Sequence, residues 1–134
     1  MLPRINHIQY YEDLIKLKDL ILNDNQNRFD CIVALKRSGW IVGCYLSNVF
    51  DIPVFTESEI KSIPTNKFKS ILLVDDKIYS GKSINKAKLK IYKQFGFRNI
   101  NIKIAVLYLE GNNNKIDIDY QVLKLDKSYK MWYE

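Results

Sequence analysis

The chain has few of the residues that build metal centres and disulfide frameworks. Its 134 residues include two cysteines and one histidine. Cys31 and Cys44 lie in apolar surroundings without a Cys-x-x-Cys spacing, so we expect free, buried thiols rather than a disulfide or a metal site. His7 has no cysteine or carboxylate at ligand spacing, which favours a surface or helix-capping histidine over a metal ligand or catalytic group.

Long apolar runs are also missing. No run approaches the length that spans a membrane, and the N-terminal residues lack the apolar core of a signal peptide. We therefore expect a cytoplasmic protein with no membrane partner.

The composition is that of an ordinary globular domain. Hydrophobic residues make up 47% and charged residues 27% of the chain, which predicts a single domain over residues 1–134. The 21 Lys and Arg against 15 Asp and Glu give a net charge of +6, which favours anionic ligands. Because the lysines are spread along the chain, a phosphorylated small molecule is favoured over nucleic acid.

The most informative stretch covers residues 71–83. An apolar run at 71–74 predicts a buried parallel strand, and Asp75 and Asp76 follow it directly. The turn at 80–83, Ser-Gly-Lys-Ser, then opens a helical pattern. Ligands of α/β sheets bind where strands end and helices begin, so this stretch predicts a site for a molecule that carries hydroxyls and phosphate. The alternative is an acidic strand end followed by an ordinary serine-capped helix.

A second strand-to-helix junction lies earlier in the chain. An apolar run at 31–35 predicts a strand, and residues 36–39, Lys-Arg-Ser-Gly, separate it from a helical pattern at 40–50. For Arg37 and Gly39, the position beside the downstream motif favours a bound anion over a solvated loop, whereas for Lys36 alone the solvated loop is favoured.

The remaining pattern alternates helices with strands. Helices are predicted at 10–22 and 84–95, and strands at 52–55, 99–109 and 118–125. Pro53 suits an edge strand because it cannot donate to a sheet ladder. This alternation predicts an α/β protein with a mainly parallel central sheet.

Residues 71–83 resemble the motif with which type I phosphoribosyltransferases bind 5-phosphoribosyl pyrophosphate (PRPP). The resemblance implies a single three-layer α/β/α domain. It also implies that Asp75 and Asp76 face the ribose hydroxyls, directly or through Mg²⁺. The residues implied to hold the 5-phosphate are Ser80, Gly81, Lys82 and Ser83.

Residues 32–53 look like the pyrophosphate loop and helix of the same family, closest to its xanthine and xanthine-guanine branch. That branch has an Arg-Gly-Gly turn where this chain has Arg37-Ser38-Gly39. By this resemblance Lys36 and residues 37–39 bind pyrophosphate, with Arg37 stabilising the departing group, and a cis peptide bond is expected near Lys36.

Two departures from the family pattern lie beside the acids. Lys77 stands where an apolar residue is usual, and Tyr79 takes the place of a residue that is often an acid-base aspartate in the purine enzymes. Near the C-terminus, the resemblance implies that Tyr129 or Trp132 stacks on the base and that Lys130 meets an exocyclic oxygen. The alternative, favoured for Trp132, is that these aromatic residues cover a core edge.

The resemblance implies an Mg²⁺-dependent phosphoribosyltransferase that moves the 5-phosphoribosyl group of PRPP to a nitrogenous base, a purine in the first instance, and releases pyrophosphate. A homodimer is implied by the family. One alternative is a non-catalytic sensor for PRPP or a nucleoside monophosphate, favoured by Tyr79, Ser38 and a connection at 56–69 that is short for a lid. A flavodoxin-like or receiver-type module is disfavoured, because its acids would follow an early strand.

Overall fold

The computed structural model describes residues 3–24, 28–111, 116–126 and 129–134. The elements in chain order are α1 (His7–Leu22), β1 (Cys31–Ala34), α2 (Lys36–Phe50), β2 (Val54–Thr56), the 3₁₀ helix η1 (Glu57–Ser62), β3 (Ser70–Ile78), α3 (Lys82–Gln94), β4 (Asn101–Glu110) and β5 (Tyr120–Leu125).

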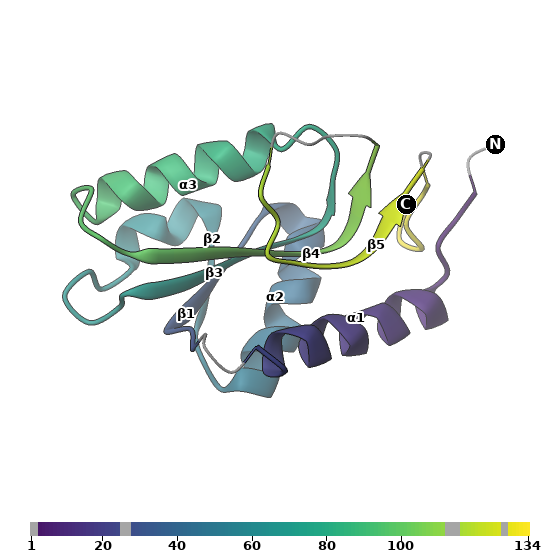
Figure 1. Ribbon diagram of the computed structural model, residues 1–134, viewed down its shortest axis with the longest axis horizontal. Coiled ribbons are helices and arrows are strands. Elements are labelled where there is room, and N and C mark those ends of the chain that lie inside the picture. The colour runs from purple at the N-terminus through teal and green to yellow at the C-terminus, as the bar shows by residue number, and fades with distance from the viewer. Residues whose placement is uncertain (1–2, 25–27, 112–115, 127–128) are drawn as a thin grey trace.

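The five strands form one sheet in the order β2-β1-β3-β4-β5, and every neighbouring pair is parallel (Figure 1). Helices α1 and α2 cover one face, and α3 with η1 covers the other. The predicted three-layer α/β/α fold is therefore confirmed. Strand β2 lies at the edge, as the proline before it indicated.

The two faces of the sheet build two hydrophobic cores. On β3, Leu72 and Val74 pack against α1 and α2, whereas Ile71 and Leu73 pack against α3. This is the alternation of a strand that is buried on both faces. Helix α2 approaches the sheet closely at Gly43, where an added Cβ would lie 2.8 Å from the Ala34 Cβ. That close contact holds the middle of α2 against the end of β1.

Both N-terminal helices begin earlier than predicted. Helix α1 starts at His7 instead of residue 10, because the Asn6 side chain caps it by accepting a hydrogen bond from the Gln9 backbone N–H at 2.9 Å. His7 is exposed, as expected, but belongs to the helix rather than preceding it. Helix α2 starts at Lys36, so the predicted basic loop is its first turn.

Strand β3 is longer than the apolar run at 71–74 from which it was predicted. It continues through Asp75 and Asp76 to Ile78, because β4 pairs with it over this whole length, with Asp75 opposite Val106. Strand β1 pairs only as far as Val74. The two acids therefore lie inside β3, at the point where its other neighbour has ended.

The chain ends meet beside α1, as Figure 1 shows. Arg4 and Lys130 form a parallel bridge, in which the Ile5 N–H donates to the Lys130 carbonyl at 2.8 Å. Within the described residues, no helix has the length and apolar character needed to cross a membrane.

Candidate functional site

The centre of the candidate site is the pair Asp75 and Asp76, whose exposed fractions are 2% and 3%. Strand β1 pairs with β3 only as far as Val74, so both acids lie beyond the end of β1, at the carboxyl edge of the sheet. The Asp76 N–H donates to Asp75 Oδ1 at 2.8 Å. Two adjacent buried carboxylates repel each other, and such an arrangement is typical of functional sites rather than of stable cores.

Asp75 faces the turn at residues 80–83, which the sequence predicts to bind phosphate. It lines a cavity of about 80 Å³ together with Lys36 and residues 77–84. The Lys36 Nζ lies 4.0 Å from Asp75 Oδ2. Burial first, and then the charge of Asp76, raise the pKa of Asp75 to about 8, although Lys36 and the Asp76 N–H oppose the shift. A cation or a set of hydroxyl donors at this edge would relieve that unfavourable charge.

Asp76 faces the opposite side of the strand, toward α1 and the C-terminal residues. Its Oδ2 accepts a hydrogen bond from the Tyr133 hydroxyl, and its charge raises the pKa of the buried Tyr10, after the larger effect of burial. Among the described residues, the Tyr10 hydroxyl is the buried side-chain polar atom that has no hydrogen-bond partner. Because successive side chains of a strand point to opposite faces, the two acids have different surroundings.

Residues 80–83 form the junction between β3 and α3. Gly81 is the N-cap of α3 with φ +77°, and an added Cβ would lie 1.3 Å from the Ile116 Cδ1, so only glycine fits there. The first turn of α3 contains no acidic residue. Its N-terminal N–H groups and positive dipole end, with exposed Lys82 and half-buried Ser83, can accept a phosphate.

Residues 36–39 form the first turn of α2 beside the acids. Gly39 lies tightly against β3, since an added Cβ would lie 3.1 Å from the Val74 carbonyl oxygen and 3.2 Å from Asp75 Oδ1. Lys36 has φ +57°, and no peptide bond in the described chain is cis. The expected cis bond is therefore wrong: the sharp change of direction after β1 is made by the left-handed conformation of Lys36 instead.

The arginine and the serine of this turn point to different neighbours. Arg37 is exposed and lines a surface hollow with Lys36, Trp40 and residues of β2 and η1, whereas Lys36 also reaches the cavity at Asp75. Ser38 hydrogen-bonds to the Tyr133 hydroxyl. Lys36, rather than Arg37, is thus the residue of this turn that forms an ion pair with Asp75.

Tyr79 is 68% exposed and lines the small cavity, with its ring near the backbone of Gly111. Lys77 is partly buried, and its Nζ lies 3.4 Å from Glu110 and 3.9 Å from Glu134. The Lys77 ammonium also donates to the Tyr129 carbonyl at 3.1 Å. These contacts explain a charged residue at a position where the resemblance predicts an apolar one.

The C-terminal aromatic residues form a cluster over Tyr10. Trp132 packs edge-to-face on Tyr10 at 6.0 Å and on Tyr133 at 5.4 Å between ring centroids, and Tyr129 packs at the border of the α1 core. Tyr133, rather than either of the two aromatics singled out from the sequence, contacts an acid of the site. It was missed because nothing in the local sequence distinguishes three neighbouring aromatics; Lys130 is exposed.

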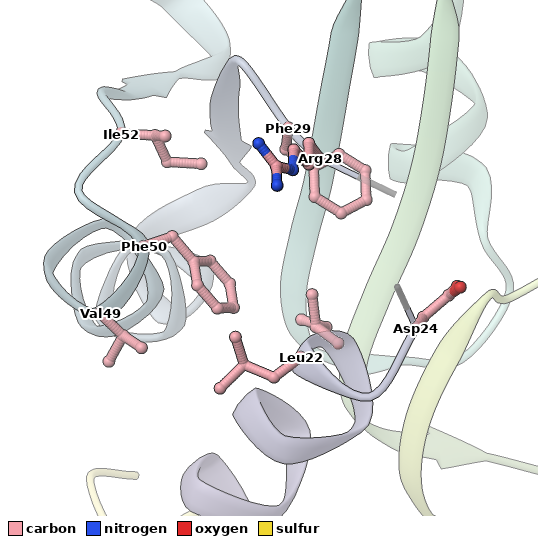
Figure 2. Close-up of a pocket in the computed structure, with 8 residues that line it drawn as sticks. Leu22, Asp24, Arg28, Phe29, Val49, Phe50 and Ile52 are labelled. Atoms are coloured by element: carbon pink, nitrogen blue, oxygen red, sulfur yellow. The ribbon is translucent and has the colours of Figure 1, made fainter. Parts of the chain in front are cut away.

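A larger cavity, of about 600 Å³, lies at the other edge of the sheet (Figure 2). Leu22 and Phe50, at the C-terminal ends of α1 and α2, point toward each other across it, and Phe29 and Ile52 come from segments that lead into strands. Its lining is mainly apolar, with Asp24 and Arg28 at the rim. It has neither the paired acids nor a helix N-terminus, so its chemistry does not suit a phosphorylated sugar.

Magnesium was expected at Asp75 and Asp76. Within the described ranges no group of three His, Cys, Asp or Glu side chains is placed to hold a metal ion. Two carboxylates nevertheless fit the usual protein contribution to Mg²⁺, which takes one or two carboxylates and completes its shell with water and phosphate oxygens. The residues therefore fit a metal that arrives with a phosphorylated ligand.

No protein-family model matches this sequence, and no curated protein does. Solved structures do. The xanthine-guanine-hypoxanthine phosphoribosyltransferase of Helicobacter pylori has a TM-score of 0.82 and 18% identity, covering 98% of this chain and 92% of that one. A purine phosphoribosyltransferase from Pyrococcus horikoshii has a TM-score of 0.77 and 21% identity over 98% and 93% of the two chains.

A third similar structure is a hypothetical protein from Neisseria gonorrhoeae with bound ppGpp, at a TM-score of 0.77 and 17% identity over 100% and 90% of the two chains. At these identities the likeness concerns the fold. The chain has the type I phosphoribosyltransferase fold, with the carboxyl edge of β3 as its candidate site.

Proposed function

We propose that this protein is a phosphoribosyltransferase that transfers the 5-phosphoribosyl group of PRPP to a purine base and releases pyrophosphate. The observation that carries the proposal is the junction at the end of β3. There a buried acid, the Lys36 ammonium and the N-terminus of α3 line one cavity. The purine phosphoribosyltransferases among the similar structures support the choice of base.

Each part of the junction has a role in this proposal. Asp75 and Asp76 accept hydrogen bonds from the vicinal ribose hydroxyls, and the turn at 80–83 holds the 5-phosphate through its N–H groups and the Lys82 ammonium. Magnesium bound with the ligand supplies Lewis-acid neutralisation of the pyrophosphate. The acids orient the sugar so that its anomeric carbon faces the incoming base.

The first turn of α2 is proposed to receive the leaving group. Lys36 lies beside Asp75, and Arg37 adds an exposed cation to the same turn. Two cations and the backbone of this turn stabilise the charge that develops on pyrophosphate as the bond to the ribose breaks. We also propose that the protein acts in the cytoplasm and as a homodimer.

The test is a calorimetric titration of the protein with PRPP, with and without Mg²⁺, followed by purine and pyrimidine bases while pyrophosphate release is monitored. The double variant Asp75→Asn with Asp76→Asn is expected to lose Mg²⁺-dependent binding while its circular dichroism stays unchanged. A matched control replaces the exposed Asp117 and Asp126 by asparagine and should bind normally. Unchanged PRPP affinity in the site variant would sink the assignment.

A second candidate is a sensor that binds PRPP or a purine nucleotide without turnover. Tyr79 favours it, because an exposed tyrosine stands where an acid-base aspartate is usual in the purine enzymes. The ppGpp-bound protein among the similar structures shows that this fold can hold a nucleotide with additional phosphates. Binding without pyrophosphate release, for every base tested, would favour the sensor over the enzyme.

A further inference from the structure

The C-terminal segment, residues 129–134, contacts Asp76, one of the two acids of the candidate site. The Tyr133 hydroxyl donates a hydrogen bond to Asp76 Oδ2 and accepts one from Ser38. Tyr133 thereby joins the last residues of the chain to β3 and to the first turn of α2. These are the two elements that build the candidate site.

The segment is fastened by contacts on both of its sides. The Arg4 guanidinium donates to the main-chain carbonyls of Trp132 at 3.2 Å and Glu134 at 2.7 Å. On the other side, the Lys77 ammonium donates to the Tyr129 carbonyl and lies 3.9 Å from the Glu134 carboxylate. Lys77 stands on the same strand as Asp76, so the strand itself carries an anchor for the segment.

The packing of the segment is that of a surface layer. Tyr133 is 38% exposed and Trp132 39% exposed, although both rings contact Tyr10 edge-on. Met131 is the buried residue of the segment. The side chains of Trp132 and Tyr133 can therefore move away while the core remains closed.

The hydroxyl of Tyr133 takes the position of a ligand group. A carboxylate offers acceptor sites only, and the Tyr133 hydroxyl occupies Asp76 Oδ2, one of the two oxygens that could accept from a sugar hydroxyl or a metal-bound water.

We propose that residues 129–134 form a C-terminal latch, in which the Tyr133 hydroxyl occupies Asp76 until the hydroxyls of a phosphorylated ribose displace it. The inference rests on the proposed function for the identity of the ligand. The latch itself is a property of the free protein. Ligand binding and opening of the latch are therefore coupled, and each must oppose the other.

The latch is tested first without ligand. Backbone hydrogen exchange at Lys130 and Met131 is compared in the wild-type protein, in Tyr133→Phe and in the control Tyr11→Phe, which alters an exposed tyrosine on α1. Loss of a hydrogen bond to a charged group should make exchange in Tyr133→Phe about tenfold faster. The control should exchange at the wild-type rate. Equal rates in all three proteins would overturn the latch.

The competition is tested by titrating the same proteins with PRPP and Mg²⁺. Tyr133→Phe should bind about tenfold tighter than wild type, because no hydroxyl has to leave Asp76. A merely structural role for Tyr133 would weaken binding instead. Equal or weaker binding by Tyr133→Phe contradicts the proposal. Faster exchange with no PRPP binding in any of the proteins supports the contact and overturns the proposed function.

Discussion

Replacing Asp75 by asparagine should change how the stability of the protein depends on pH. The pKa of Asp75 is raised to about 8 by burial and by the charge of Asp76, whereas an aspartate in an unfolded chain titrates near pH 4. Between these two values the folded protein holds a proton that the unfolded chain has released. The free energy of unfolding should therefore fall as the pH rises from about 4 to about 8.

The size of the effect follows from one proton. Each pH unit inside this window lowers the free energy of unfolding by at most about 1.4 kcal/mol. For a domain of this length that corresponds to a decrease in the melting temperature of roughly 3 to 6 °C per pH unit. Asparagine is neutral at every pH, has nearly the same shape, and still offers an oxygen to the Asp76 N–H, so Asp75→Asn should lack this slope.

The assay is thermal unfolding followed by circular dichroism at pH 5, 6, 7, 8 and 9, in buffer that contains a chelator so that no cation neutralises the acids. Other groups titrate in both proteins, so the difference between wild type and Asp75→Asn isolates this carboxyl. The variant should become progressively more stable than wild type toward pH 8. Parallel curves for the two proteins would refute a buried Asp75 whose pKa is raised above its usual range.

Three further predictions concern the fold around the site. Tyr108→Phe should lower the free energy of unfolding by about 1 to 3 kcal/mol in urea titrations, because it removes a 2.6 Å hydrogen bond to the buried Asp13; stability within experimental error would show that the bond contributes nothing. Gly81→Ala should reduce both stability and PRPP affinity, since its φ of +77° is strained for alanine and the space is filled; wild-type values of both would contradict the geometry of the turn. Burial raises the pKa of Cys31 to about 12, so a thiol reagent at pH 8 should label Cys44 first and Cys31 only on unfolding, and mass spectrometry of the peptides would expose the reverse order.

Much of this architecture was determined by local sequence. The apolar run at 71–74 and its counterpart at 31–35 became β3 and β1, and the breaks near residues 80 and 96 became the ends of α3, because periodicity and glycine act over a few residues. The same local signal placed two acids and a basic turn at one edge of a parallel sheet. The resemblance to a PRPP-binding motif rests on these residues, and the observed fold agrees with it.

Only the tertiary structure decided how the acids are used. Because β4 is long, its pairing extends β3 through Asp75 and Asp76. Side chains alternate along a strand, so Asp75 faces the turn at residues 80–83 and Asp76 faces α1 and the C-terminal residues. Lys77 became a partner of Glu110 for the same reason. The bond between Asp76 and Tyr133 joins residues 57 positions apart, and such a contact depends on the packing of the whole chain, which a local pattern does not encode.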